Sequence, residues 1–351
     1  MKGKLLCFLI AVLILTITFS GCVEQPIESK TIYVDSKGGK DYTNIQAAIN
    51  AANDGYTIHV YSGTYNENLV IDKTINLIGE DKDKTIILGN ENTDGITINK
   101  DQISISGFTI KSGIGTRAIR INSSNNIISD NNLSDNSWGI YTENAPNNMI
   151  SENIIGNNIE GIAMWSSDGC TIIKNIIYSN NSHSNFGVYA QSCNQTIFSE
   201  NTVYTSKRGV QFISSHNLTI SGNAIHSNSN TGLHLADSCE NNEIYNNDIY
   251  LNGHGFIILN SDYNTIYNNN FFNNTNADAY EYASDPNDPT SSVLLDNSWD
   301  FNSNGNYWGN YNGIDANGDD IGDTPYNISV ALSSQKEWNQ DRFPLMNPVD
   351  I

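Results

Sequence analysis

The stretch GLHLADSCENNEIYNNDIYLNGHGFIILN, residues 232–260, contains one period of a repeat and the start of the next. It opens with a glycine followed by an apolar, a variable and an apolar residue (GLHL), and it continues to an apolar segment around one asparagine (IYNNDI, residues 244–249). The glycine pattern returns after 23 residues as GFII. Glycines at 139, 161, 187, 209, 232 and 255 begin the same pattern, with spacings of 22 to 26 residues.

This period predicts a β-solenoid. Short segments in which apolar and polar residues alternate form strands with one buried face, and the Asn, Ser and Gly residues between them form turns. One unit of about 22–23 residues cannot bury its apolar face alone, so similar units stack and share a continuous core. We therefore predict an all-β parallel β-helix.

One asparagine per coil occupies an equivalent position in the repeat. The members of this column are Asn131, Asn153, Asn175, Asn201, Asn223, Asn247 and Asn269. Their side-chain amides, stacked one coil apart, are expected to hydrogen-bond to one another and to form a ladder at an inward turn. Most of the asparagine content is therefore predicted to be structural.

The cysteines test the register. Cys193 and Cys239 each precede a ladder asparagine by eight residues, at a position that holds small residues in the other coils. They are two coils apart, which is about 9.6 Å at a strand spacing of about 4.8 Å. A disulfide requires Cα atoms within roughly 7 Å, so we predict that these two cysteines and Cys170 are free and buried.

The two ends of the repeat are distinct from its middle. Residues 41–55 predict an amphipathic helix with a capping box from Thr43 to Gln46 and a stop at Gly55, which covers the open edge of the first coil. We therefore expect an N-terminal cap over 32–56 and coils over 57–284. Residues 285–351 lose the repeat and are expected to form a C-terminal cap or tail.

The first residues predict export. Lys2 and Lys4 precede an apolar run that is too short to span a membrane. Ser20-Gly21-Cys22 matches the end of a lipobox, which predicts a lipoprotein signal peptide at 1–21, lipidation of Cys22 and a tether over 22–31. The net charge of −21 repels nucleic acid and anionic lipid, so we expect no nucleic-acid partner and membrane contact only through the anchor.

Two parts of the chain resemble known families. Residues 41–81 resemble the opening of right-handed parallel β-helix proteins of the pectin-lyase-like superfamily, which implies right-handed winding. The asparagine-rich coils and the segments NYWGNYNGIDANGDDIGDTPYNI (306–328) and DRFPLMNP (341–348) resemble the NosD-like copper-protein family. The superfamily includes lyases, hydrolases, epimerases and non-enzymatic adhesins, so the resemblance implies a fold and selects no activity.

Two outward columns lie on the strand that begins at the repeat glycine, one just before the glycine and one two residues after it. Aromatic rings cover the apolar faces of sugars, and polar side chains hydrogen-bond their hydroxyls. The carbohydrate-binding candidates are Trp138, Tyr141, Tyr189, Gln211 and His234. If this face is a lyase or epimerase site, the candidate catalytic residues are Arg117, Arg120, Glu160 and Arg208. Solvated decoration of the strands is the alternative interpretation.

The same register decides whether other candidate motifs can lie together. Asp94 and His254 resemble parts of the polygalacturonase motifs, but they are 160 residues apart. That separation is roughly seven coils, or over 30 Å, whereas inverting hydrolysis needs carboxylates within about 10 Å. Hydrolysis by this motif is therefore excluded. A further outward column predicts an aromatic stack of Tyr178, Tyr204, His226, Tyr250 and Phe272.

The sequence contains residues that are candidate ligands for copper and for calcium. Copper needs clustered imidazole, thiolate or thioether groups, and the histidines are scattered, so we predict no dedicated copper site. Positions 1, 3, 5, 7 and 9 of a calcium loop are matched by Asp315, Asn317, Asp319, Ile321 (through its carbonyl) and Asp323. Asp320 stands where glycine is customary, and Tyr326 where glutamate is. The loop predicts weak, structural Ca²⁺ binding, with a polar turn-rich loop as the alternative.

We therefore expect a lipid-anchored β-helix protein on the outer face of the cell membrane. It is predicted to bind carbohydrate or a cell-envelope partner without catalysis. A polysaccharide lyase or C5-epimerase that uses an Arg/Glu/Tyr groove is the second hypothesis. An accessory protein for copper delivery or metalloenzyme maturation, implied by the NosD resemblance, is the third.

Overall fold

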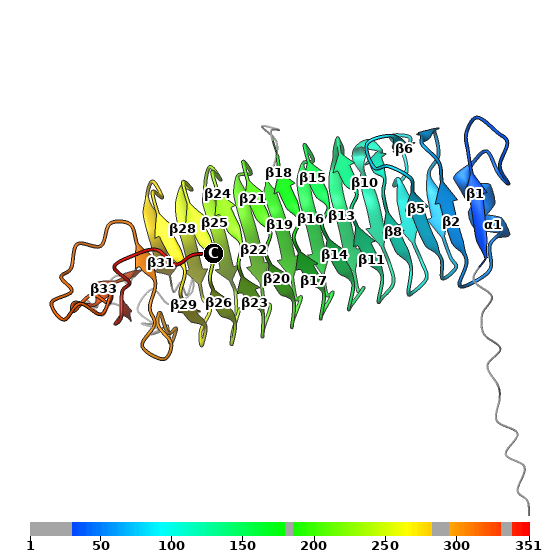
Figure 1. Ribbon diagram of the computed structural model, residues 1–351. Coiled ribbons are helices and arrows are strands. Elements are labelled where there is room, and N and C mark those ends of the chain that lie inside the picture. The colour runs from blue at the N-terminus through cyan, green and yellow to red at the C-terminus, as the bar shows by residue number, and fades with distance from the viewer. Residues whose placement is uncertain (1–29, 180–184, 283–294, 331–338) are drawn as a thin grey trace, which may run out of the picture.

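The computed structural model describes residues 30–179, 185–282, 295–330 and 339–351. They form an elongated stack of coils that winds into three parallel sheets of eleven strands each (Figure 1). The all-β parallel β-helix predicted from the repeat is therefore confirmed, as is the right-handed winding implied by the resemblance. Among the described residues, no helix is both long and apolar enough to cross a membrane.

Each coil adds one strand to each sheet. Sheet A contains β1 (Thr31–Val34), β2 (Thr57–Val60), β5 (Asn76–Gly79), β8 (Ser104–Ser106), β11 (Ile127–Ser129), β14 (Met149–Ser151), β17 (Thr171–Ile173), β20 (Ile197–Ser199), β23 (Thr219–Ser221), β26 (Glu243–Tyr245) and β29 (Thr265–Tyr267). Sheet B contains β3 (Gly63–Tyr65), β6 (Thr85–Leu88), β9 (Thr109–Lys111), β12 (Asn132–Ser134), β15 (Ile154–Gly156), β18 (Ile176–Tyr178), β21 (Thr202–Tyr204), β24 (Ala224–His226), β27 (Asp248–Tyr250), β30 (Asn270–Phe272) and β32 (Tyr307–Trp308). Sheet C contains β4 (Leu69–Ile71), β7 (Ile96–Ile98), β10 (Gly113–Ile121), β13 (Asn136–Glu143), β16 (Glu160–Trp165), β19 (Phe186–Gln191), β22 (Arg208–Ile213), β25 (Thr231–Ala236), β28 (His254–Leu259), β31 (Ala277–Tyr282) and β34 (Ser329–Val330).

The core is a set of aliphatic columns that run along the axis. On sheet C, Ile162 lies in register with Ile140 on one side and Val188 on the other, and all three are fully buried. Stacking at about 4.8 Å places each apolar side chain against its counterpart in the next coil. Burial of a side chain of this size stabilises the fold by roughly 1.5–3 kcal/mol, which explains why neighbouring coils keep strict register.

The repeat glycines mark a close approach between coils. A Cβ added at Gly187 would lie 2.6 Å from the carbonyl oxygen of Gly209 and 2.6 Å from Cγ1 of Val203. The same approach to a carbonyl of the next coil, at 2.3–2.8 Å, recurs at Gly139, Gly161, Gly209, Gly232 and Gly255. The position that reveals the period in the sequence is therefore one where neighbouring backbones leave no room for a side chain.

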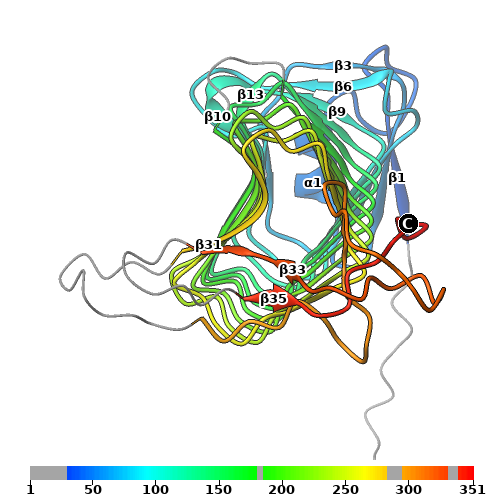
Figure 2. The same ribbon diagram turned by 90° about the vertical axis from the view of Figure 1, so that its left-hand side faces the viewer.

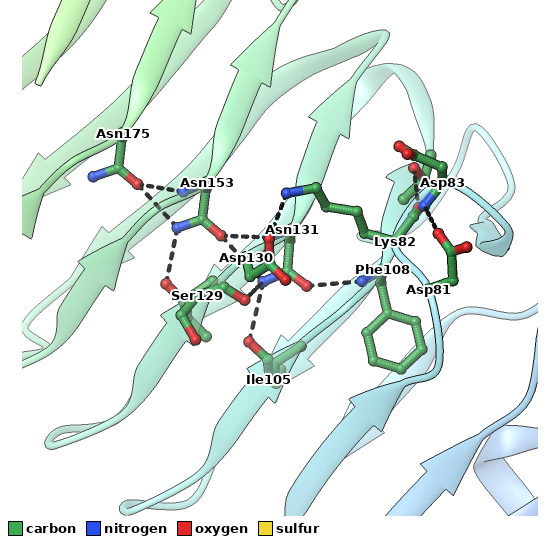
Figure 3. Close-up of polar contacts among 12 residues, drawn as sticks. Asp81, Lys82, Asp83, Ile105, Phe108, Ser129, Asp130, Asn131, Asn153 and Asn175 are labelled. Atoms are coloured by element: carbon green, nitrogen blue, oxygen red, sulfur yellow. Dashed lines mark hydrogen bonds and ion pairs between the residues drawn. The ribbon is translucent and has the colours of Figure 1, made fainter.

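The seven asparagines of the predicted column form a hydrogen-bonded ladder, and Figure 3 shows its rungs at Asn131, Asn153 and Asn175. The side-chain nitrogen of each donates to Oδ1 of the next asparagine, at 2.8–3.2 Å from Asn131 to Asn269. That Oδ1 also accepts the backbone N–H of the preceding asparagine, and the second amide hydrogen is donated to a carbonyl of an earlier coil, as in Asn153 to Ile128 at 2.8 Å. All seven side chains are buried, and their polar groups are satisfied.

Two further ladders occupy the other turns, and the sequence pattern did not reveal them. One contains Asn126, Asn148, Asn242, Asn264 and Asn297 and is interrupted by Cys170, Thr196 and Leu218. The other contains Asn136, Asn158, Asn228, Asn252 and Asn274. Because other residue types replace asparagine in both columns, neither gives an unbroken signal in the sequence.

All three ladders end on a buried carboxylate at the C-terminal end. The first continues through Asn306 to Asp341, the second ends at Glu281, and the third ends at Asp278. The amides all donate in the same direction, so the last amide of each ladder needs an acceptor. An ionised carboxylate supplies one, because it accepts hydrogen bonds and has no donor of its own. Burial raises the pKa of Glu281 to about 7 and that of Asp341 to about 6.

The N-terminal end is covered by α1 (Ile45–Ala51), whose Ile45, Ala48 and Ile49 are buried against the first coils. The predicted capping box from Thr43 to Gln46 is wrong. Asn44 is the N-cap and accepts the backbone N–H of Ala47 at 3.0 Å. Gln46 instead bonds the backbone of Val70, while the Glu67 carboxylate accepts the first helical N–H groups. A tertiary contact has replaced the local one.

The C-terminal end is closed by aromatic residues. Trp299 and Trp308 are buried, and their indole nitrogens donate to Glu281 and Asp341, respectively, so they connect the cap to the ladder ends. Beyond residue 285, β32 and β34 extend sheets B and C, and β1 already belongs to sheet A. The sheets therefore run past the predicted coil limits of 57 and 284. The short strands β33 (Tyr326–Asn327) and β35 (Gln340–Asp341) form a separate antiparallel pair.

Candidate functional site

The outer face of sheet C carries the two columns expected from the sequence, and the register aligns them along the axis. The first column is Arg117, Trp138, Glu160, Phe186, Arg208, Thr231 and His254. The second is Arg120, Tyr141, Ala163, Tyr189, Gln211, His234 and Ile257. Viewed along the axis, sheet C bends toward the interior of the solenoid (Figure 2).

A third outward column was missed. It contains Glu143, Trp165, Gln191 and Ile213, which pair in register at the C-terminal ends of the same strands. The signal was present, because each lies two residues after a member of the second column. Trp165 is its most relevant member for ligand binding.

Aromatic rings form a continuous strip on the first half of this face. Ring centroids are separated by 6.4 Å for Trp138–Tyr141, 5.0 Å for Tyr141–Trp165, 5.4 Å for Trp165–Tyr189 and 5.2 Å for Tyr189–Phe186. Each contact joins rings at tilted or edge-to-face angles, which is the favoured geometry of aromatic pairs. The strip spans β13, β16 and β19.

Arginines flank the strip at both ends. The Arg117 guanidinium lies 5.0 Å from the Trp138 ring and 4.4 Å from the Tyr141 ring, and it forms an ion pair with Asp94 at 3.4 Å. Arg120 lies 5.7 Å from the Tyr141 ring, and Arg208 lies 5.4 Å from the Phe186 ring. Both the distances and the planar guanidinium suit stacking on the rings.

Two carboxylates beside the strip accept hydrogen bonds from its rings. Glu160 accepts the indole N–H of Trp138 at 2.9 Å, and burial raises the pKa of Glu160. The hydroxyl of Tyr141 donates to Glu143 at 3.0 Å. Of the four candidate catalytic residues, Glu160, Arg117 and Arg120 contact rings within the strip, whereas Arg208 lies at its far edge on the Phe186 ring.

The second half of the face is polar. Gln211 is 7% exposed and lies in register with Tyr189 on β19 and His234 on β25. Burial and the nearby charge of Arg208 lower the pKa of His234 to about 4, so its imidazole is neutral at pH 7. His254 lies on the adjacent strand β28, but its in-register partner is Thr231, so His234 and His254 occupy different columns.

The hydrolase motif is separated as the sequence predicted. Asp94 precedes β7, and His254 lies on β28, seven strands further along sheet C. At about 4.8 Å per strand the separation is about 34 Å. Asp94 bonds Arg117 instead, so the two residues do not share a site.

The predicted aromatic stack is present on the outer face of sheet B. Tyr178, Tyr204, His226, Tyr250 and Phe272 stack with centroids 4.8–5.3 Å apart and ring planes within 17° of parallel. A Cβ at Gly156 would lie 2.3 Å from the ring of Tyr178, so that ring covers the glycine. The stack accounts for these residues as cross-strand packing.

The carboxylates of the predicted calcium loop accept hydrogen bonds from the backbone of the same loop. Both carboxylate oxygens of Asp315 accept backbone N–H groups, from Gly318 and Asp319 on one oxygen and from Asp320 on the other, and Asp323 accepts that of Ala316. Asp320 adopts a φ of 65°, the left-handed conformation for which glycine is customary. Among the described residues no group of three or more His, Cys, Asp or Glu side chains is arranged to hold a metal.

Cys170, Cys193 and Cys239 are buried and free, as predicted. Burial raises the pKa of Cys193 to about 12 and those of the other two to about 11, so all three are protonated thiols. Cys170 stands in one of the asparagine columns. Cys22, the predicted lipidation site, lies outside the described residues.

The chain is a right-handed parallel β-helix with an aromatic and charged strip on the outer face of sheet C. The family model described as "Periplasmic copper-binding protein (NosD)" matches residues 27–214 and 147–313, and the chain therefore belongs to the NosD family. That description agrees with an exported protein.

Solved structures share the fold at low identity. The A-module of a mannuronan C-5 epimerase from Azotobacter vinelandii has a TM-score of 0.61 and 16% identity, over 71% of this chain and 81% of its own. DFA-IIIase from Arthrobacter chlorophenolicus, solved with DFA-III, has a TM-score of 0.54 and 12% identity, over 80% of this chain and 83% of its own.

A curated relative matches a short part of the chain. A probable pectinesterase/pectinesterase inhibitor from Arabidopsis thaliana is 42% identical over 76 residues, which is 19% of this chain and 14% of the relative. The match therefore spans a small fraction of either protein.

Proposed function

We propose that the protein is an exported, lipid-anchored β-helix that binds a carbohydrate chain of the cell envelope along the outer face of sheet C. The observation that carries this proposal is the strip of five rings, Trp138, Tyr141, Trp165, Tyr189 and Phe186, with centroid spacings of 5.0–6.4 Å. Rings in a row offer apolar surface to successive sugar units, and Arg117, Glu143 and Glu160 supply polar groups beside the rings.

The distribution of charge supports an acidic chain. The protein has four arginines, at 117, 120, 208 and 342, and a net charge of −21. Three of the four lie on the outer face of sheet C. A guanidinium binds carboxylates with paired hydrogen bonds, so these arginines can bind a negatively charged sugar despite the negative net charge of the protein.

The structural neighbours are consistent with a carbohydrate ligand, since by name one of them is a mannuronan C-5 epimerase. A lyase or epimerase activity is the second candidate function. The polar half of the face, where Tyr189, Gln211 and His234 pair in register, is the observation that favours it.

Binding is tested by calorimetry with defined oligosaccharides, both acidic and neutral. Trp165→Ala removes the central ring of the strip and is expected to weaken binding by 10-fold or more, about 1.4 kcal/mol. Tyr245→Ala removes a ring from sheet A, which is stacked on Tyr267 away from this face, and serves as the control. No binding by the wild type, or equal losses in both variants, would refute the proposal.

The anchor is tested separately. Cys22→Ser is expected to release the protein from the membrane fraction into the soluble fraction, because one acyl-modified cysteine is the proposed attachment. Mass spectrometry of the wild-type N-terminal peptide should show lipid on Cys22. An unmodified cysteine there would eliminate the anchor without affecting the binding proposal.

A further inference from the structure

The polar half of sheet C contains buried polar atoms without partners. Among the described residues, seven buried side-chain polar atoms have no hydrogen-bond partner, and four of these seven belong to Gln211, His234 and His254. They are Oε1 of Gln211, both ring nitrogens of His234 and Nδ1 of His254, on the consecutive strands β22, β25 and β28. A buried unsatisfied polar group costs roughly 1–3 kcal/mol, so such a cluster calls for a partner outside the chain.

The register places four side chains with different functional groups around this cluster. Tyr189, Gln211 and His234 are in-register neighbours on three adjacent strands, about 4.8 Å apart from one strand to the next. Arg208 lies on the same strand as Gln211, and its charge acts on His234. A phenol, an amide, an imidazole and a guanidinium therefore lie on three adjacent strands of one face, within two strand spacings along the axis.

Each group has a protonation state set by its surroundings. The imidazole of His234 is neutral, and both of its ring nitrogens are buried without a hydrogen-bond partner. The phenol of Tyr189 keeps its proton because burial raises its pKa, and it now donates to Gln191 at 2.8 Å. The guanidinium of Arg208 stays positive at all ordinary pH values, and the Gln211 amide has donors as well as the unpaired oxygen.

We propose that Tyr189, Gln211, His234 and Arg208 form a site that removes the proton next to the carboxylate (C5–H) of an acidic sugar unit in the bound chain. The proposal rests on the function proposed above, since the strip must hold the chain before the proton can be removed. It also replaces the expectation of binding without catalysis, and it assigns the base to His234 rather than to Glu160 or an arginine.

The steps balance without any co-reactant. A ring nitrogen of His234 takes the C5 proton, and the C–H electron pair moves into the carboxylate as an enolate, which Arg208 and the Gln211 amide hydrogens stabilise. If the C4–O bond then breaks, the electron pair held in the enolate forms a C4–C5 double bond, the C4–O pair leaves on the oxygen, and Tyr189 gives its proton to that oxygen. If it does not break, a proton returns to C5. Removal of the C5 proton is common to both outcomes.

Deuterium exchange tests this common step. The full-length protein is incubated with oligogalacturonate and with oligomannuronate in D₂O, and proton NMR follows the C5–H signal, while absorbance follows unsaturated product. The wild type is expected to exchange C5–H in at least one of the two probes. His234→Gln is expected to slow exchange by about 100-fold or more while affinity measured by calorimetry stays within a few-fold.

His226→Gln is the matched control, because His226 lies in the ring stack on sheet B and should leave exchange unchanged. Tyr189→Phe should retain exchange and lose unsaturated product if the wild type forms any. Binding of a probe without exchange, or undiminished exchange in His234→Gln, would overturn this inference and leave the binding proposal intact. Failure of the wild type to bind either probe or any neutral oligosaccharide would overturn both.

Discussion

Asn153 is the position at which the structural role of the ladder can be measured most directly. Its side chain is fully buried and makes contacts to both neighbouring coils (Figure 3). Its Oδ1 accepts the backbone N–H of Asn131 at 3.0 Å and the side-chain nitrogen of Asn131 at 3.1 Å. Its own amide donates to Ile128 and Asn175. The change Asn153→Ala removes all of these contacts at once.

The expected loss of stability follows from the groups left without partners. Two donors of Asn131 lose their acceptor, and the Ile128 carbonyl loses a donor. At roughly 1–3 kcal/mol for each buried unsatisfied group, the two donors alone predict a loss of roughly 2–6 kcal/mol. The ladder that begins at Asn126 has other residues at three successive coils, Cys170, Thr196 and Leu218. A single replacement between two asparagines, as in Asn153→Ala, is therefore a different case.

Urea unfolding measures the effect, with amide hydrogen exchange to locate it, because stacked coils need not unfold in one step. Exchange should accelerate first in β14 and β15. The control is Asn132→Ala, since Asn132 faces outward on β12 and is expected to change stability by less than about 0.5 kcal/mol. Equal losses for the two variants would refute the account of the ladder as a set of obligatory buried hydrogen bonds.

Three further predictions concern the ladder ends, the loop and the thiols. Burial raises the pKa of Glu281 from 4.5 to about 7, so the folded protein holds this proton more tightly than the unfolded chain, and wild-type stability should fall as pH rises through this window. Glu281→Gln should therefore show a smaller fall in urea-unfolding free energy between about pH 5 and pH 8 than the wild type, and equal slopes would contradict the assignment. Ca²⁺ should raise the melting temperature of the wild type more than that of Asp319→Ala, and the same shift in both would remove the loop as the binding site. Thiol reagents should leave Cys170, Cys193 and Cys239 unlabelled in the native protein and label them after denaturation, as judged by peptide mass spectrometry; native labelling would show that the coils open.

Part of the aromatic strip on sheet C could be predicted from the register of the repeat. Once the glycine period is known, the residues before and after each glycine are assigned to columns, and the structure places Trp138, Tyr141 and Tyr189 on one face as those columns require. Trp165 was missed although the same register indicates it, since it lies two residues after Ala163 of the second column on β16. The register does not show that Glu160 accepts the Trp138 indole, since that contact depends on rotamers.

The ends of the solenoid were the least predictable part. Thr43 and Gln46 match a capping box, but Glu67 of a later coil takes the N–H groups that the box would satisfy. At the other end, Asp341 and Asn306 are separated by 35 residues and lie beyond the last recognisable repeat, yet they close the first ladder. Contacts between segments of different coils are set by packing, and no local pattern encodes them.

The sequence by itself determined the coil, its period and its core, because a repeat that buries the same positions in every turn must reproduce the same backbone in every turn. It also determined the first asparagine ladder, in which every coil contributes the same residue. Only the tertiary structure decided that there are three ladders, that each ends on a carboxylate, and that Gln211 and His234 have unpaired buried atoms. The physical reason is that hydrogen-bond satisfaction depends on where atoms from separate coils meet, and a one-dimensional pattern records which residues recur but not which of their polar atoms find partners.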